Sequence, residues 1–280
     1  MLPAHGSEPT LSIIGAGRVA STLGRVLAAH AAVQIGNVLA RHAASARATV
    51  DFIGAGTPVT AYTDLRAADV YLLAVPDDQI ATCCAQLVAS GVLCQGAVVF
   101  HCSGALEAEV LTTARQAGAA VASLHPVRSF ADPAAVADDF AGTCCGIEGD
   151  RAATDLLRKM FEAAGARVIP IDAAHKTLYH AAAVFASNYV VTLIDVAMQV
   201  YGQAGVAPAV ALEMIAPLLR ESAENAFRLG PEAALTGPVA RGDTGTVMRQ
   251  QAALAAWHPA HADLYALLAD ATAALAAHRP

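Results

Sequence analysis

The chain has 280 residues, of which 56% are hydrophobic and 15% are charged, and its formal net charge is −7. A chain of this length forms one large domain or two smaller ones around a sizeable core. Its composition excludes extensive disorder, and its acidic balance argues against a general nucleic-acid-binding protein.

Other features bear on the compartment. No apolar run reaches the roughly 18 residues that a membrane span requires, and residues 1–10 lack the basic and apolar regions of a signal peptide. The cysteines form no C-x-x-C pair, so we expect neither a zinc site nor a disulfide framework. We therefore expect a cytoplasmic protein with buried thiols, no metal and no membrane partner. The cysteines are Cys83, Cys84, Cys94, Cys102, Cys144 and Cys145.

The most informative stretch is an apolar run, residues 11–14, that ends in Gly15-x-Gly17-x-x-Ala20. It predicts a buried strand, a tight turn and the start of a helix. Such a turn binds a pyrophosphate through free N–H groups and the positive helix end. Gly15 would adopt a conformation closed to side chains, and Gly17 would let a phosphate approach. We favour a dinucleotide site over a purely structural turn, with Ala16, Arg18 and Val19 completing it.

A second strand is expected over residues 33–40, directly before Arg41. In a dinucleotide-binding fold, an acidic residue at this place binds the ribose 2′-hydroxyl of NAD. Arg41 instead offers a planar set of donors to a phosphate, and Ser45 adds a hydroxyl. This favours NADP over NAD. The alternative is a solvated arginine at a strand end.

Apolar segments then alternate with helical ones up to residue 171, which predicts an α/β fold with a doubly wound parallel Rossmann sheet. Ligands of such sheets bind beyond the carboxyl ends of the strands. Val75, Pro76, Ser103 and His125 should therefore surround one crevice with the glycine turn. The expected strands span residues 68–75, 96–100, 119–124, 143–147 and 167–171, and the expected helices span 80–87 and 151–164.

The alternation stops after Asp172, where long helical segments begin. We predict a dinucleotide-binding domain over residues 1–172 and an all-helical domain for substrate binding and dimerisation over residues 173–280. Pro217 should kink or break one of the helices. The expected helices span residues 174–201, 208–229, 246–257 and 260–277.

The first of these helices carries a suggestive polar stripe. At about 100° per residue, Lys176, Tyr179, His180 and Ser187 share one face, and Asn188 lies at its edge. Burial would lower the pKa of Lys176 or His180 and place a proton donor near neutral pH. The alternative is that Lys176 extends to solvent and His180 is a core histidine with its hydrogen bonds satisfied.

Further polar residues have simpler interpretations. Asp77 and Asp78 follow a proline and are expected to cap the next helix, and Asp243 is expected to cap the helix near Thr246. Arginine suits a substrate carboxylate because its guanidinium is forked. Arg128 and Arg241 are the candidates for that role.

Six motifs occur in order along the chain: Gly15-x-Gly17-x-x-Ala20, Ala74-Val75-Pro76-Asp77, His101-x-Ser103-Gly104-Ala105, His125-Pro126-x-Arg128-Ser129-Phe130, Ala186-Ser187-Asn188-Tyr189 and Gly237-Pro238-x-x-Arg241-Gly242-Asp243. Together they resemble a Rossmann-like oxidoreductase family whose C-terminal half is a domain of unknown function. Its layout is similar to pyrroline-5-carboxylate reductase, prephenate dehydrogenase and the 6-phosphogluconate dehydrogenase group. The resemblance implies an NAD(P) domain followed by a helical domain that forms a homodimer.

The resemblance also carries over to single residues. His125-Pro126 resembles the His-Pro that follows a strand in prephenate dehydrogenases. Ser187-Asn188 falls where those enzymes have Ser-His, so Asn188 replaces their catalytic histidine. Lys176 with Asn188 is similar, at a longer spacing, to the Lys and Asn of β-hydroxyacid dehydrogenases.

These observations predict an NADP-dependent dehydrogenase or reductase that transfers a hydride between nicotinamide and a C=O or C=N carbon of a small, anionic metabolite. Ser103 and His125 would lie near the nicotinamide. Lys176 or His180 would handle the proton, and Asn188 would orient the substrate. Ser187, Arg128 and Arg241 would complete the substrate site. The alternatives are a non-catalytic NADP-binding sensor or assembly protein and a dimer scaffold that binds NADP.

Overall fold

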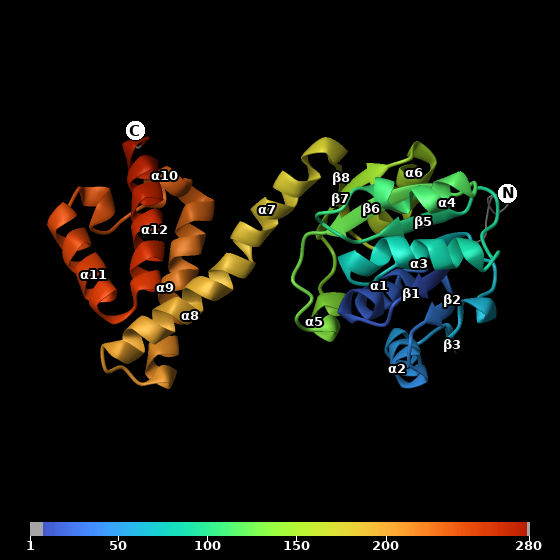
Figure 1. Ribbon diagram of the computed structural model, residues 1–280, viewed down its shortest axis with the longest axis horizontal. Helices are drawn as coiled ribbons and strands as arrows, with labels where there is room; N and C mark the ends of the chain where they lie inside the picture. Colours follow the sequence, from blue (N-terminus) through green and yellow to red (C-terminus); the bar gives the residue numbers. More distant parts are fainter. Residues whose placement is uncertain (1–7, 279–280) are drawn as a thin grey trace. The chain divides into compact units, whose positions relative to one another are not determined.

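The computed structural model describes residues 8–278, and Figure 1 shows its ribbon. Residues 1–7, which belong to the segment where no signal peptide is expected, lie outside the described residues. The chain divides into two compact units, Met1–Ser187 and Asn188–Pro280. This division falls after the boundary expected at residue 172, because the first turn of the following helix buries Lys176 within the first unit.

The first unit is built on an eight-stranded sheet with the strand order β3-β2-β1-β4-β5-β6-β7-β8. Its α/β architecture is the one expected. The strands are β1 (Thr10–Ile14), β2 (Gln34–Leu39), β3 (Thr57–Val59), β4 (Val70–Leu73), β5 (Val98–His101), β6 (Ala120–Pro126), β7 (Cys144–Gly149) and β8 (Arg167–Pro170).

The sheet is parallel except at one position, where β7 runs antiparallel to β6. The sheet is therefore mostly parallel, as expected, and departs from the predicted parallel order only in β7 and β8, which run opposite to the other strands. The connection between β6 and β7 carries α5 (Pro133–Asp138), which packs against α1 (Arg18–Ala29). Because α5 does not form a crossover helix over β6 and β7, β7 returns in the opposite direction.

Helices cover both faces of the sheet (Figure 1). Along β4, Leu72 joins the core beneath α1 and α6 (Arg151–Ala163), whereas Tyr71 and Leu73 join the core beneath α3 (Asp77–Ala89). Strands buried on both faces read as continuous apolar runs, which is why β4 was predictable. The remaining helices of this part are α2 (Ala43–Ile53) and α4 (Thr112–Gln116), with 3-10 turns η1 (Tyr62–Asp64), η2 (Ala108–Leu111) and η3 (Ala173–His175).

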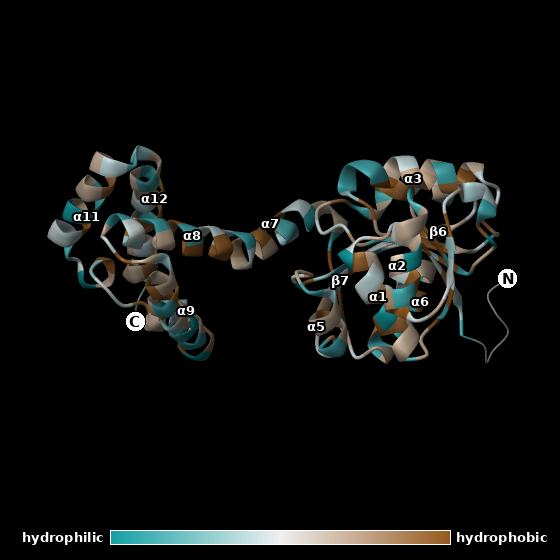
Figure 2. Cartoon of the chain, turned by 90° about the horizontal axis from the view of Figure 1, so that it is seen from below, coloured by the Kyte–Doolittle hydropathy of each residue, from teal (hydrophilic) through white to brown (hydrophobic). Residues whose placement is uncertain are grey.

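The long helix expected over residues 174–201 is interrupted. It forms α7 (Lys176–Ala186) and α8 (Asn188–Gln203), because Ser187 has φ −128° and ψ −73°, outside helical geometry. By length and composition, helical residues 173–203 could cross a membrane, with a mean hydropathy of 1.6. Lys176, His180 and Asn188 interrupt its apolar residues, so the expectation of no membrane partner stays untested. A single such helix is weak evidence, and Lys176 packs its first turn into the first unit. Figure 2 shows the apolar residues along α7 and α8 in brown.

In the second unit, every regular element of the described residues is helical, as expected. Pro217 lies inside α9, which continues without the predicted break. Large apolar side chains remain exposed here, including Phe227 at 83%, Leu267 at 70% and Met248 at 68%. The elements after α8 are α9 (Pro208–Leu229), α10 (Pro231–Ala234), η4 (Val239–Arg241), α11 (Thr244–Trp257) and α12 (Pro259–Ala277).

The cysteines are all free. Cys84 and Cys145 are buried, as expected of structural thiols. Cys94 is exposed, so the expectation of buried thiols is wrong at that position.

Candidate active site

The glycine turn joins β1 to α1, and its two glycines have different environments. Gly15 has a φ of +119°, and a Cβ there would lie 2.1 Å from the carbonyl oxygen of Ala74. A Cβ on Gly17 would meet nothing within 4 Å. Gly17 is the N-cap of α1, and no side chain caps that helix. The turn therefore offers open space before uncapped backbone N–H groups, which is the arrangement that binds anions.

Two cavities of about 560 and 570 Å³ adjoin this turn and share Gly17, Ala74, Val75 and Pro76 among their lining residues. One extends along the end of β2 and the other toward Ser103. Together they place all ten residues predicted to bind the cofactor around one crevice. These residues are Gly15, Ala16, Gly17, Arg18, Val19, Arg41, Ser45, Val75, Pro76 and Ser103.

The β2 end of the crevice contains Arg41, His42 and Ser45. None of the described residues that line this cavity is an aspartate or glutamate. His42 is the N-cap of α2, and no side chain caps that helix either. A guanidinium beside an uncapped helix N-terminus favours a phosphate over a ribose hydroxyl at this place.

At the other end, Ser103 holds the loop after β5. Its Oγ donates a hydrogen bond of 2.7 Å to Asp77 Oδ2 and accepts the N–H groups of Ala105 and Leu106 at 3.1 and 2.9 Å. The prediction that Asp77 caps α3 is wrong. Asp77 is already the first residue of that helix and Pro76 is its N-cap, so the carboxylate is free to reach Ser103. Asp78 gives α3 no cap either; it accepts a hydrogen bond from Gln79.

His101 is a buried histidine beneath this loop. Its Nδ1 accepts the Ser103 N–H at 3.1 Å, and its Nε2 lies 3.2 Å from the carbonyl oxygen of Glu107. Burial, aided by the positive charge of Lys176, lowers the pKa of His101 to about 4. His101 is thus a neutral side chain that fixes the loop.

A cluster of three polar rings lies at the end of β6. His125 Nδ1 is 3.0 Å from the hydroxyl of Tyr179, and their rings meet edge to face with centroids 5.6 Å apart. The ring of His180 meets the ring of His125 in the same way at 5.4 Å. We call these three residues the histidine–tyrosine cluster. All of them belong to the first unit.

Two glycines make room for this cluster. A Cβ on Gly104 would lie 2.2 Å from His180 Nδ1 and 2.9 Å from His125 Nε2. A Cβ on Gly146 would lie 2.5 Å from the Tyr179 hydroxyl. Bare backbone at both positions therefore lets the rings approach one another. His180 Nδ1 is buried and has no hydrogen-bond partner among the described residues, so His180 is not the satisfied core histidine of the alternative interpretation.

The protonation of the cluster follows from its burial. Burial, together with the neighbouring His180 and Lys176, lowers the pKa of His125 to about 4. Burial also raises the pKa of the Tyr179 phenol. At neutral pH the cluster therefore presents a neutral imidazole beside a protonated phenol. Tyr179 was placed on the polar stripe by its spacing, but nothing in the sequence indicated that it contacts His125.

Lys176 does not face the crevice. Its side chain is fully buried, and its Nζ donates to Ser123 Oγ and, over 2.8 Å, to Glu148 Oε1. Burial lowers its pKa, whereas Glu148 opposes that shift. Both donors of Lys176 described here go to groups of the protein, and its role as a proton donor to substrate stays a prediction. The alternative, in which Lys176 extends to solvent, is wrong.

The residues predicted to bind the substrate lie in different surroundings. Arg128 already donates to the carboxylate of Asp139 at 2.7 Å and to Thr143 Oγ1 at 3.2 Å, so its charge is matched within the protein. Ser187 is exposed at the interruption between α7 and α8. Asn188 and Arg241 belong to the second unit, and their roles stay predictions.

Comparison with known families identifies two consecutive domains. A model described as a Rossmann-like domain matches residues 6–126, and a model described as a domain of unknown function (DUF2520) matches residues 143–272. The chain carries a Rossmann-like domain followed by a DUF2520 domain. The resemblance found in the sequence motifs is thereby confirmed.

Solved structures share this architecture over nearly the whole chain. Protein TM1727 from Thermotoga maritima is 28% identical, with a TM-score of 0.74, over 95% of this chain and 98% of its own. A candidate NADP oxidoreductase from Bacteroides fragilis is 23% identical, with a TM-score of 0.75, over the same shares. Pyrroline carboxylate reductase from Plasmodium falciparum, solved with NADP bound, is 11% identical, with a TM-score of 0.61, over 97% and 100%. No curated protein matches the chain.

The two family matches divide the candidate site between them. The glycine turn and His125 lie in the Rossmann-like match, whereas Tyr179 and His180 lie in the DUF2520 match. The DUF2520 match also begins at the antiparallel strand β7. The histidine–tyrosine cluster is therefore composite, and both domains supply its side chains.

Proposed function

We propose that the chain is an NADP-dependent oxidoreductase that acts on a C=O or C=N carbon of a small metabolite. One observation carries this proposal: an open glycine turn lies between cavities that run from Arg41 to Ser103, and the histidine–tyrosine cluster stands at the neighbouring strand end. The likeness to a candidate NADP oxidoreductase and to a reductase with NADP bound supports it.

The cofactor residues divide into three groups along the crevice. The uncapped N-terminus of α1 and the backbone of residues 15–17 hold the pyrophosphate. Arg41 and Ser45 hold the 2′-phosphate. Ser103 and Pro76 border the nicotinamide end. Bound NADPH supplies the hydride.

His125 donates a hydrogen bond to the substrate, and solvent supplies the proton that completes the reduction. We assign the Tyr179 hydroxyl as the donor to His125 Nδ1, which puts the imidazole proton on Nε2, the nitrogen that faces Gly104. A neutral Nε2–H donates a hydrogen bond to the substrate oxygen or nitrogen as negative charge develops there. His180 supplies the second ring beside Nε2. These roles replace the one predicted for Lys176.

Arg241 is the remaining candidate for an anionic group of the substrate, because Arg128 is already paired with Asp139. Arg241 ends η4, and its guanidinium suits a carboxylate. Asn188 is retained as the residue that orients the substrate.

Titration with NADPH and NADH, followed by a screen of ketones and imines read by nicotinamide absorbance, tests the proposal. We expect tighter binding of NADPH and turnover of one substrate class. Equal affinities would remove the argument from Arg41. Tight NADPH binding without turnover in any class would favour the alternative, a non-catalytic NADP sensor or assembly protein.

We also propose a cytoplasmic homodimer that forms through the helical second unit. The exposed Phe227, Met248 and Leu267 support this assembly, since apolar side chains at such exposure gain from burial against a second copy. Light scattering in solution tests it, and a monomer at micromolar concentration would count against it.

A further inference from the structure

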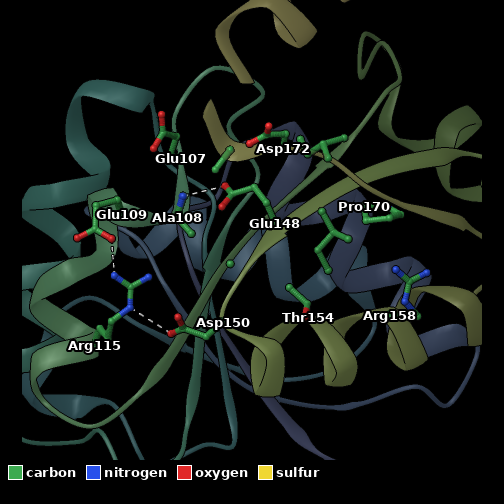
Figure 3. Close-up of a pocket in the computed structure, with 14 residues that line it drawn as sticks. Glu107, Ala108, Glu109, Arg115, Glu148, Asp150, Thr154, Arg158, Pro170 and Asp172 are labelled. Atoms are coloured by element: carbon green, nitrogen blue, oxygen red, sulfur yellow. Dashed lines mark hydrogen bonds and ion pairs between the residues drawn. The ribbon is translucent and has the colours of Figure 1, made fainter. Parts of the chain in front are cut away.

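The first turn of α7 is held by a buried ion pair between Lys176 and Glu148. Both side chains are nearly inaccessible, with exposed fractions of 0% and 7%. Lys176 Nζ donates to Glu148 Oε1 over 2.8 Å and also to Ser123 Oγ. The same Oε1 accepts the N–H of Ala108 at 2.8 Å, a bond that Figure 3 shows. Glu148 Oε1 thus accepts hydrogen bonds both from Lys176 and from the backbone of Ala108.

The antiparallel pairing of β6 and β7 brings this ion pair into line with the histidine–tyrosine cluster. In the register of the two strands, Ser123 lies opposite Glu148, and His125 lies opposite Gly146. Lys176 therefore contacts both residues of the Ser123–Glu148 strand pair. The histidine–tyrosine cluster contacts the His125–Gly146 strand pair, two residues further along, since the Tyr179 hydroxyl lies against Gly146.

The helix has the matching spacing. Tyr179 and His180 follow Lys176 by three and four residues, so the three side chains share one face of α7. Holding the ammonium between Ser123 and Glu148 fixes the rotation of α7 about its axis and its position along that axis relative to the sheet. Lys176 is the only fully buried residue of α7, and the contact of Tyr179 with His125 is the other contact of that first turn described above.

We infer that the Lys176–Glu148 ion pair is the positioning element of the active site, which holds α7 so that Tyr179 and His180 meet His125. Replacing a buried ion pair by neutral groups of similar size often leaves stability unchanged, so its presence is better explained by geometry than by stability. The positioning of α7 does not depend on the proposed function. Only the catalytic use of the histidine–tyrosine cluster rests on that function.

The test compares the double variant Lys176→Met/Glu148→Gln with the matched control Lys159→Met, which removes the exposed lysine of α6. The double variant leaves no uncompensated charge, whereas Lys176→Met alone would strand a buried carboxylate. Three properties are measured in each protein: the NMR titration and tautomer of His125, amide hydrogen exchange over residues 177–180, and the Kd for NADPH.

In the double variant we expect at least tenfold faster exchange over residues 177–180, loss of the single His125 tautomer, and a His125 pKa that rises toward its ordinary value. The Kd for NADPH should stay within twofold, because no residue of α7 lines the cofactor cavities. With a substrate in hand, kcat should fall about tenfold or more at unchanged KM for NADPH. The Lys159→Met control should match the wild type throughout.

Unchanged exchange and an unchanged His125 titration in the double variant would overturn the inference. So would a loss of turnover with His125 undisturbed, which would return Lys176 to a direct role in proton transfer. If the double variant does not fold, Glu148→Asp takes its place, since it keeps both charges and draws the carboxylate away from Lys176 by one methylene. The NMR and exchange measurements need no substrate. A protein without turnover would therefore refute the proposed function, while these measurements would still support or overturn the positioning role of the ion pair.

Discussion

Gly15 and Gly17 belong to one turn, yet substitution at each should have a different effect. Gly15→Ala places a Cβ against the Ala74 carbonyl at a φ closed to alanine, so we expect a loss of about 1–3 kcal/mol in the free energy of unfolding. Gly17→Ala enters open space, so stability should hold while the Kd for NADPH rises about tenfold, or 1.4 kcal/mol. Urea denaturation and calorimetric titration measure the two effects.

Gly202→Ala is the control, because a Cβ there meets nothing within 4 Å and lies far along the chain in α8. It should leave the Kd for NADPH unchanged and should not lower the free energy of unfolding, because alanine favours a helix over glycine. A Gly17→Ala protein that binds NADPH as well as the wild type would show that the phosphates do not approach this backbone.

Arg41 should decide between the two dinucleotides. In Arg41→Asp we expect the Kd for NADPH to rise roughly ten- to hundredfold, the range for hydrogen bonds to a charged group, whereas the Kd for NADH should change little. Fluorescence titration with both cofactors measures this. Arg47→Asp makes the same charge change on α2 outside the cavity and should leave the preference intact. Parallel losses for both cofactors in Arg41→Asp would place Arg41 away from the 2′-phosphate.

Among single residues, the sequence brought the glycine turn and Arg41 to one crevice but missed the partners of Lys176 and Tyr179. The glycine turn and Arg41 are local signals, since a turn and a strand end determine where they lie. Lys176 was assigned to the substrate because its partners, Ser123 and Glu148, come from strands that are distant in sequence. The contact of Tyr179 with His125 spans 54 positions and leaves no spacing signal.

Among the elements, α11 depends on one capping residue. The Asp243 carboxylate accepts the Thr246 N–H at 3.0 Å and the Thr246 hydroxyl at 2.7 Å, as the sequence predicted. Asp243→Ala should lower the stability of the second unit by about 1 kcal/mol, the usual effect of losing an N-cap. Urea denaturation monitored at Trp257 measures it, with the exposed Asp270→Ala of α12 as control. An equal stability for the two variants would mean that the cap contributes nothing.

The elements that the sequence predicted are those with long apolar runs. β4 and α6 agree closely with their expected ranges, because burial on both faces, or on one helical stripe, imposes a periodic pattern. The direction of β7 was missed because strand polarity depends on where α5 packs, and its own six residues look the same either way. The interruption at Ser187 was missed because Ala186-Ser187-Asn188 contains no glycine or proline.

For the whole molecule, the buried histidines predict the pH dependence of stability. His101 has a pKa of about 4, below its ordinary 6.5, so the folded state binds fewer protons than the unfolded state between these values. This contribution is fully present above pH about 6.5 and is lost as the pH falls toward 4; for one fully buried histidine it is on the order of 3 kcal/mol. His125 acts in the same direction.

Urea denaturation at pH 7 and pH 4.5 measures the dependence. Between pH 7 and pH 4.5 the free energy of unfolding should fall less in His101→Asn than in the wild type. The exposed His42→Asn should not have this effect. A His101→Asn protein with the wild-type pH slope would show that this histidine is protonated alike in both states.

The boundary at Ser187 has a consequence for how such proteins diversify. Every side chain proposed here to bind the coenzyme or to form the histidine–tyrosine cluster precedes it, from the first glycine to the last ring. On the proposed function, changes in the helices beyond Ser187 would alter the substrate residues Asn188 and Arg241 and leave the coenzyme residues as they are. If the proposed function holds, a lineage of such proteins would take new substrates by varying the part of the chain after Ser187 while residues 1–187 stay unchanged.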